Sequence, residues 1–208
     1  MDEDLGRARA IVYDFDGVLV DSNDLKRDTF YEIWDRPPAS LRALVDQVLA
    51  RPGDRFSFIR EVHDQLGGRP SLGRDAQHYI ERYTRAVEDA ILARGLKPDV
   101  PPFLEAHVDQ IQLINSATPE APLRSIVSRL GLGRWIRETR GRPLDKTGIF
   151  AYFMAKYQLT PDEILFVGDA ESDYQVARQL GLAFLGIASA GGSLRSVPGR
   201  VRLPAPTA

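Results

Sequence analysis

The sequence predicts an α/β protein in which a parallel sheet carries an all-helical insertion directly after its first strand. Two observations support this fold class. Short and nearly continuous apolar runs alternate with amphipathic helical patterns, as expected for parallel strands that are covered on both faces. A long stretch near the N-terminus, residues 21–100, holds several helical patterns and no convincing strand.

Four apolar runs are predicted strands. They are residues 8–13, 111–115, 164–167 and 182–187. The helical pattern after the second run has clear ends, since Thr118 and Pro119 form an N-cap and a first-turn proline, and Gly131 ends the helix. Strands that alternate with helices of this length imply a parallel sheet built from right-handed crossovers.

The insertion contains helical patterns separated by breaks rich in proline and glycine. The predicted helices are residues 24–34, 41–49, 55–66 and 75–92, and the breaks are residues 36–38, 51–54 and 67–70. Pro98, Pro101 and Pro102 mark the return to the α/β part. The predicted domains are therefore a core of residues 1–20 and 101–208 and a helical insertion of residues 21–100. The proline-rich tail from Pro198 is expected to be a loose terminus.

The aromatic and histidine side chains have simple predicted roles. The aromatic residues at helical spacing are expected to pack rather than to bind a ligand; they are Trp34, Trp135, Tyr79 and Tyr83. The three histidines show no metal-ligand spacing and are expected on helix surfaces; they are His63, His78 and His107.

The composition excludes several classes of protein. The 208 residues carry 27 basic and 29 acidic side chains, a net charge of −2, which argues against a dedicated nucleic-acid binder. Because the chain has no cysteine, disulfides, thiolate nucleophiles, zinc–cysteine sites and iron–sulfur clusters are excluded. No segment approaches the roughly 20 apolar residues of a membrane span, and the first residues are acidic. We therefore expect a cytoplasmic protein that binds neither membrane nor nucleic acid.

Two carboxylates follow the first predicted strand. Asp14 and Asp16 stand two residues apart, and Gly17 comes next. In an open α/β sheet, ligands bind outside the carboxyl ends of the strands, so this is a favourable position for function. An Asp-Gly turn with a helix-capping aspartate is the alternative for this motif taken alone.

A second acidic cluster, Asp169 and Asp173, follows the strand at residues 164–167. Acidic residues favoured by a helix dipole would explain this cluster alone. Carboxylates that converge from two parallel strands, however, repel one another unless a cation joins them, and oxygen ligands suit Mg²⁺. Ser116 ends another strand and Lys146 precedes the second cluster; taken alone, they would be a helix cap and a solvated surface lysine.

In the order DxDG, Ser, Lys and GDxxxD, these motifs resemble the haloacid dehalogenase (HAD) superfamily, and the resemblance covers essentially the whole chain. The helical insertion is similar to the cap of the phosphoglycolate-phosphatase-like branch, and residues 116–119 and 168–174 are close to that branch's pattern. The resemblance implies a Rossmann-like core with a helical cap. It also implies a Mg²⁺-dependent phosphatase that acts on a small phosphorylated metabolite, such as a sugar phosphate or phosphoglycolate.

Each matched residue has a role implied by this resemblance. Asp14 is the expected nucleophile, which forms an aspartyl-phosphate, and Asp16 is the expected general acid and base. The expected metal site consists of Asp14, Asp169 and the backbone carbonyl of Asp16. Asp173 is the family's second acidic position, where it holds a metal-bound water or Lys146. The residues expected to bind phosphoryl oxygens are Ser116, Ala117 and Lys146.

The insertion offers three candidate contacts to the rest of the substrate: Lys26, Arg55 and Arg60. Phosphonate-cleaving relatives use a cap lysine that forms a Schiff base with the substrate, and Lys26 is the candidate for that role in this chain. The simpler interpretation is that Lys26 is a surface residue of the first helix of the insertion. The carboxylate of Asp16 favours a phosphatase or a phosphomutase over a dehalogenase. A sugar phosphomutase on the same fold and a non-catalytic phosphoacceptor module stay alternatives. We expect a monomer or a homodimer.

Overall fold

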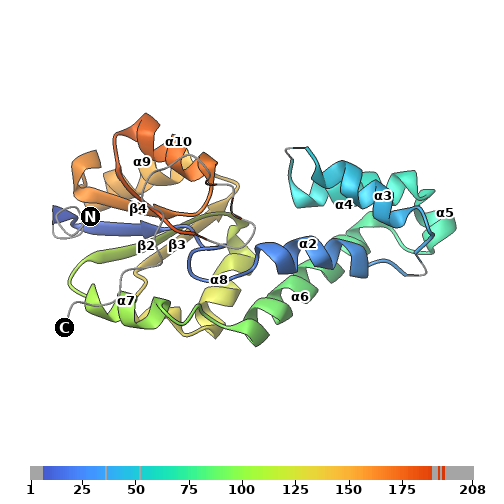
Figure 1. The fold of residues 1–208 in the computed structure, drawn as a ribbon, viewed down its shortest axis with the longest axis horizontal. Helices are drawn as coiled ribbons and strands as arrows, with labels where there is room; N and C mark the ends of the chain where they lie inside the picture. Colours follow the sequence, from blue (N-terminus) through green and yellow to red (C-terminus); the bar gives the residue numbers. More distant parts are fainter. Residues whose placement is uncertain (1–6, 36, 52, 189–191, 193, 195–208) are drawn as a thin grey trace. The chain divides into compact units, whose positions relative to one another are not determined.

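The computed structural model describes residues 7–35, 37–51, 53–188, 192 and 194, so the tail from Pro198 lies outside the described residues. The chain divides into two compact units (Figure 1). One unit is formed by Met1–Asn23 together with Ile91–Ala208, and it contains the sheet. The other unit, Asp24–Ala90, holds only helices among its described regular elements.

The strands of the first unit pair in parallel in a five-stranded sheet of order β3-β2-β1-β4-β5. Their bounds are β1 (Ala10–Tyr13), β2 (Ile111–Pro119), β3 (Glu138–Arg142), β4 (Ile164–Gly168) and β5 (Ala183–Gly186). The central strand β1 pairs on both sides, and its last residue Tyr13 lies opposite Ile114 of β2 and Val167 of β4. The predicted α/β class with a parallel sheet is confirmed.

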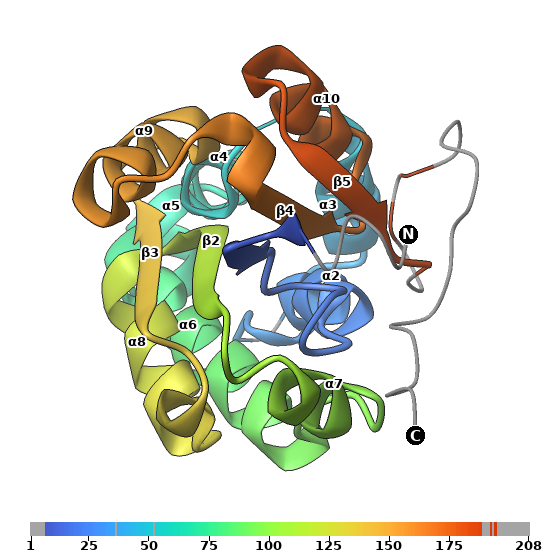
Figure 2. The same ribbon diagram turned by 90° about the vertical axis from the view of Figure 1, so that its left-hand side faces the viewer.

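Helices cover both faces of the sheet. Figure 2 shows α9 and α10 on one side and α7 and α8 on the other. Their bounds are α7 (Val100–Ala106), α8 (Glu120–Arg129), α9 (Lys146–Tyr157) and α10 (Glu171–Leu180). Alternate residues of β1 point to opposite faces, so Val12 packs in a cluster with Phe150 and Phe153 of α9, whereas the ring of Tyr13 meets Phe103 of α7 edge-on at 6.3 Å. Both faces need apolar residues, which is why the run in β1 is continuous.

The sequence prediction includes neither β3 nor α7 of the first unit. β3 has polar residues, and only Thr139 and Gly141 of its Glu138–Arg142 are buried, so no apolar run marks this edge strand. Pro101 and Pro102, which mark the return to the α/β part in the sequence, belong to a helix of the first unit that the prediction does not include, α7. Both prolines lie in the first turn of α7, where no backbone N–H is required for the helix.

The predicted helix start at Thr118 is also wrong. β2 continues to Pro119, and α8 begins at Glu120. The hydroxyl of Thr118 donates a hydrogen bond to Oδ2 of Asp16 at 3.0 Å instead of capping the helix. The predicted end of this helix is confirmed, because Gly131 follows α8 with a left-handed φ of 69°.

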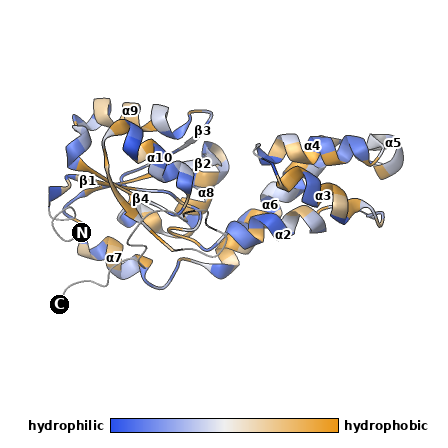
Figure 3. Cartoon of the chain, turned by 45° about the horizontal axis from the view of Figure 1, so that its top comes forward, coloured by the Kyte–Doolittle hydropathy of each residue, from blue (hydrophilic) through white to orange (hydrophobic). Residues whose placement is uncertain are grey.

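The second unit contains the helices predicted for the insertion and one additional short helix. The helices are α2 (Asn23–Glu32), α3 (Leu41–Leu49), α4 (Arg55–Gln65), α5 (Gly68–Leu72) and α6 (Ala76–Arg94). Asn23 at the start of α2 and residues 91–94 at the end of α6 belong to the first unit. The additional helix is α5, which occupies a segment predicted as a break. In Figure 3 the helices carry hydrophilic and hydrophobic residues side by side, as amphipathic helices do. No helix in the described part of the chain is both long enough and apolar enough to span a bilayer.

Aromatic rings form much of the core of the second unit. Trp34 stacks on Tyr79 with ring centroids 4.7 Å apart, and Tyr83 is also buried, so the prediction that these rings pack is confirmed. The prediction that His63 lies on a helix surface is wrong. Its side chain falls on the buried stripe of α4, is 6% exposed and has its Nε2 3.0 Å from the carbonyl oxygen of Arg74. That polar contact makes burial of the ring tolerable.

Candidate active site

Two acidic motifs meet at the carboxyl edge of the sheet. Asp14 directly follows β1, and Asp169 directly follows the neighbouring strand β4. The backbone N–H of Asp14 donates to the carbonyl oxygen of Val167 at 2.8 Å, which extends the pairing of the two strands beyond Tyr13. Because the strands are parallel, both acidic residues lie at the edge where ligands bind in such sheets.

Three buried carboxylates form a cluster at this edge. Asp14, Asp169 and Asp173 are 7%, 3% and 0% exposed, and one oxygen of each lies within 4.8 Å of the others. Asp173 lies in the first turn of α10, where its Oδ2 accepts a hydrogen bond from the backbone N–H of Ala170 at 3.1 Å. Carboxylate oxygens at this spacing could hold a divalent metal ion.

Lys146 supplies positive charge to this cluster. It is the first residue of α9, and its ammonium Nζ lies 3.0 Å from Oδ1 of Asp14 and 2.5 Å from Oδ1 of Asp173. The side-chain amide of Asn115 in β2 donates to the carbonyl oxygen of Lys146 at 3.0 Å, so strand β2 holds the start of α9 in place. The structure therefore places Lys146 between the two carboxylates.

The cluster carries more negative charge than one ammonium group balances. The pKa of Asp14 is raised to about 8: burial is the largest cause, the Lys146 ammonium opposes it, and the carboxylates of Asp173, Asp16 and Asp169 add to it. Burial alone would lower the pKa of Lys146, but the attraction of Asp14 and Asp173 raises it above its ordinary value. A bound divalent cation would favour the ionised carboxylates at neutral pH.

Asp16 has a different environment, because hydroxyl groups bind both of its oxygens. Ser22 Oγ donates to Oδ1 at 2.5 Å, and Thr118 Oγ1 donates to Oδ2 at 3.0 Å. Between Asp16 and Ser22 the loop turns at Gly17 with φ of 77°, and a Cβ there would lie 1.9 Å from Oδ2 of Asp169. Only glycine fits this position, because it must allow both a positive φ and the close approach of Asp169.

Ser116 lies at the same edge of the sheet, near the end of β2 beside β1. It is buried, and its Oγ accepts a hydrogen bond from the backbone N–H of Thr118 at 3.1 Å. Its neighbour Ala117 is exposed. This edge therefore brings together side chains from β2 and the segments after β1 and β4, and from the first turns of α9 and α10.

The three predicted substrate contacts of the insertion belong to the second unit and stay predictions. Lys26 lies on α2, and its carbonyl oxygen accepts a hydrogen bond from the hydroxyl of Tyr83 at 3.0 Å. Arg55 of α4 has its guanidinium 6.0 Å from the centre of the Tyr83 ring. Arg60, also on α4, is exposed.

A family model of haloacid dehalogenase-like hydrolases matches residues 8–181, a range that includes the carboxylate cluster and Lys146. This chain belongs to the haloacid dehalogenase-like hydrolase family. The match extends over the inserted helices and over strands β1 to β4. The resemblance seen in the motifs is confirmed, and so is the prediction of an enzyme.

Proteins similar in sequence to this hydrolase include phosphoglycolate phosphatases. The chain is 25% identical over 193 residues to a phosphoglycolate phosphatase from Pseudomonas putida, which covers 86% of this chain and 69% of that protein. The fold of this chain resembles that of a candidate β-phosphoglucomutase from Thermotoga maritima, with a TM-score of 0.69 and 15% sequence identity. The likeness covers 89% of this chain and 92% of that chain. The fold also resembles that of CbbY from Rhodobacter sphaeroides in complex with phosphate, with a TM-score of 0.64, 16% identity and coverage of 93% and 92%. At these identities, the two structures show the fold alone.

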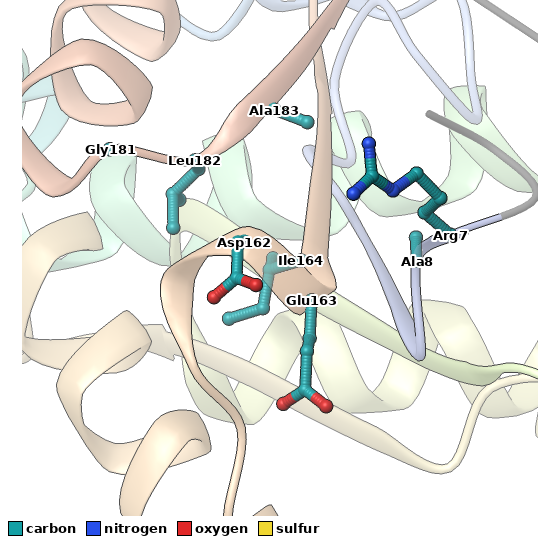
Figure 4. A pocket seen from close by; sticks show the side chains of 8 residues that line it. All are labelled: Arg7, Ala8, Asp162, Glu163, Ile164, Gly181, Leu182 and Ala183. Carbon is teal, nitrogen blue, oxygen red and sulfur yellow. The ribbon is translucent and has the colours of Figure 1, made fainter. Parts of the chain in front are cut away.

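A cavity of about 350 Å³ lies at the opposite edge of the hydrolase sheet (Figure 4). Ile164 and Ala183, which begin β4 and β5, line it together with Asp162 and Glu163. Because both strands begin at this cavity, their length separates it from Asp169. The cavity is therefore not part of the carboxylate cluster.

The sequence prediction gives Ser22 and Thr118 no role beside Asp16. Both donate hydrogen bonds to Asp16, one from the same loop and one from β2. Ser22 lies only six residues after Asp16, in a loop that turns at Gly17. This short separation is a local feature of the sequence that favours the contact between the two side chains. No comparable local signal exists for Thr118, whose contact depends on the pairing of β2 with β1.

Proposed function

We propose that this hydrolase is a Mg²⁺-dependent phosphatase that acts on a small phosphorylated metabolite, such as a sugar phosphate or phosphoglycolate. The observation that carries the proposal is the contact of Lys146 with Asp14 inside a buried carboxylate cluster. An anionic nucleophile must approach an anionic phosphate, and fixed positive charge beside it stabilises that approach. The likeness to a phosphoglycolate phosphatase supports the same class of reaction.

The reaction would proceed in two half-reactions. In the first, a carboxylate oxygen of Asp14 forms a bond to phosphorus while the ester P–O bond breaks, and Asp16 donates a proton to the departing oxygen. In the second, Asp16 takes a proton from water, and the water oxygen attacks the aspartyl-phosphate. Inorganic phosphate leaves and Asp14 is restored. Two displacements thus replace one more difficult step.

The residues that would hold Mg²⁺ are Asp14 and Asp169, through their side chains, and Asp16, through its backbone carbonyl. Asp173 contacts Lys146 at 2.5 Å, so we assign it to holding that lysine. A bound Mg²⁺ offsets the repulsion between the carboxylates and an incoming phosphate. Lys146 would contribute to the same end by binding a phosphoryl oxygen.

The remaining contacts would come from β2 and from the helical insertion. Ser116 and Ala117 would bind phosphoryl oxygens, and residues 21–100 would act as a cap that excludes water during the reaction. The cap residues proposed to contact the rest of the substrate are Lys26, Arg55 and Arg60. A monomer or a homodimer in the cytoplasm, with no nucleic acid or membrane partner, stays part of the prediction.

A sugar phosphomutase is the second candidate, and the fold likeness to a candidate β-phosphoglucomutase favours it. Both enzymes would use the same aspartyl-phosphate. They differ in the acceptor, which is water in a phosphatase and a sugar hydroxyl in a mutase. Free phosphate is the product of the first, and an isomeric sugar phosphate is the product of the second.

A screen of phosphorylated metabolites with phosphate release as the readout tests the proposal. Each compound is incubated with the full-length protein in Mg²⁺ and, in parallel, with excess EDTA. We expect at least one small phosphate ester to release phosphate in Mg²⁺ alone. Isomerisation that depends on a bisphosphate activator, without phosphate release, would favour the mutase, and the absence of turnover on every ester would contradict both candidates.

A further inference from the structure

Asn23 contacts the proposed metal site from outside the carboxylate cluster. Its side-chain amide Nδ2 donates a hydrogen bond to Oδ2 of Asp169 at 3.0 Å, across 146 positions of sequence. Asn23 is the first residue of α2 and the last residue of the first unit, and the helix continues into the second unit. The bond therefore joins a carboxylate that follows β4 to the start of the helix that leads into the insertion.

The surroundings of Asp169 restrict its carboxylate on one side. The side chain is 3% exposed, and its Oδ2 lies where a Cβ of Gly17 would be, 1.9 Å away. The same oxygen accepts the hydrogen bond from Asn23. Oδ2 of Asp169 is thus held between the backbone of Gly17 and the side-chain amide of Asn23.

We propose that Asn23 is a positioning residue for the divalent metal: it holds Oδ2 of Asp169 and so fixes the orientation of the carboxylate that would bind the cation. This inference rests on the metal site of the proposed function. A hydrogen bond to a ligating carboxylate fixes its rotation before the metal binds and offsets part of its repulsion with Asp14 and Asp173. Loss of such an outer contact typically costs about 10- to 100-fold in metal affinity.

Mg²⁺ titration by calorimetry of the full-length protein tests this assignment. The variants are Asn23→Ala and Asn23→Leu, which remove the donor with and without loss of side-chain volume. Gln77→Ala is the matched control, because the amide of Gln77 also donates to a carboxylate, that of Glu81, at 3.1 Å on the exposed face of α6. We expect both Asn23 variants to bind Mg²⁺ about 10-fold more weakly than the wild type, and Gln77→Ala to bind normally.

Equal or tighter binding by both Asn23 variants would overturn the assignment, and tighter binding would mean that the amide competes with the cation for Oδ2. Asp169→Asn separates this failure from that of the metal site itself. If the wild type binds Mg²⁺ and Asp169→Asn does not, the site stands whatever the Asn23 variants do. A wild type that binds no Mg²⁺ contradicts both the site and the role of Asn23.

A second measurement reports directly on the Asn23 amide of the wild type. The chain contains two asparagines, Asn23 and Asn115, so asparagine-selective ¹⁵N labelling gives two side-chain amide groups in an NMR spectrum. We expect the Asn23 amide signal to shift during the Mg²⁺ titration with the same midpoint as the calorimetry. An Asn23 signal that does not change while Mg²⁺ binds would contradict the proposal. Asn23→Leu assigns the signal by its disappearance.

Discussion

Asp16 is held by two hydroxyl groups, whereas Asp14, two residues earlier, is buried beside other carboxylates. Ser22 and Thr118 each donate to one oxygen of Asp16. The two acidic residues of one short motif thus have distinct surroundings, and the nucleophilic role proposed for Asp14 requires a bound cation that favours its ionised form. Their different environments are the residue-scale basis of the two roles that we propose.

Asp16→Asn removes the exchangeable carboxyl proton with almost no change in shape. We expect kcat on a phosphate ester to fall by about 10²- to 10⁴-fold, since that is the usual contribution of general acid–base catalysis. Mg²⁺ affinity should stay close to that of the wild type, because the proposed metal contact of Asp16 is its backbone carbonyl. Steady-state kinetics and calorimetry measure the two quantities, and unchanged turnover would remove Asp16 from proton transfer.

The sequence predicts the main site residues because each stands at a marked position. Asp14 and Asp169 follow apolar runs that are predicted as strands of a covered sheet, and Lys146 begins a helix. Asn23 and Thr118 are different, because their contacts join segments far apart in sequence. Such contacts depend on the strand register and on the course of the loop, and neither is encoded by a local pattern.

At the scale of elements, Glu138 joins the edge strand β3 to helix α9. Its carboxylate accepts hydrogen bonds from Tyr152, Lys156 and Tyr157 at 3.0, 2.7 and 2.7 Å. Burial alone would raise the pKa of Glu138, but these donors lower it from 4.5 to about 2. An edge strand that has few buried residues is thereby fixed to the helix that begins with Lys146.

The lowered pKa of Glu138 gives a pH dependence with a definite sign. Ionised Glu138 stabilises the folded state at pH values above about 4.5, and this contribution is lost as the pH falls toward about 2. We expect Glu138→Gln to be less stable than the wild type at neutral pH and to lose less stability over that acid range. Urea unfolding at a series of pH values measures both effects.

Tyr157→Phe removes one of the donors to Glu138 and is expected to shift stability in the same direction by a smaller amount. Parallel pH profiles of the wild type and Glu138→Gln would contradict the account of this contact.

The elements that the sequence predicts best are those buried on both faces. β1 and β4 read as continuous apolar runs because helices cover each side of the sheet. β3 has no such run, since it lies at the edge and is held by polar contacts such as those of Glu138. Pro101 and Pro102 can indicate either a break or the first turn of a helix, and in the structure they lie in the first turn of α7.

At the scale of the whole molecule, the net charge of −2 hides a local excess of negative charge. Three carboxylates lie within 4.8 Å of one another in the buried cluster, with Lys146 bound to two of them. Folding must bring these like charges together, so a cation that binds the folded state should stabilise the protein. The composition alone cannot reveal this, because charges from separate segments meet only in the fold.

Mg²⁺ should therefore raise the thermal stability of the protein. At a free Mg²⁺ concentration 100 times its dissociation constant, the expected gain in free energy of unfolding is about 2.7 kcal/mol. Differential scanning calorimetry should show a higher Tm in Mg²⁺ and reversal by EDTA. Asp169→Asn should lose the gain, and a Tm that is independent of Mg²⁺ in the wild type would contradict a metal site in this cluster.

The most direct test of the account is the Mg²⁺-dependent hydrolysis of p-nitrophenyl phosphate by the wild type and by Asp14→Asn. The matched control is Asp162→Asn, an exposed aspartate at the opposite edge of the sheet. We predict that the wild type and Asp162→Asn release phosphate and that Asp14→Asn does not, although it folds. Turnover by Asp14→Asn at the wild-type rate would contradict the assignment of Asp14 as the nucleophile.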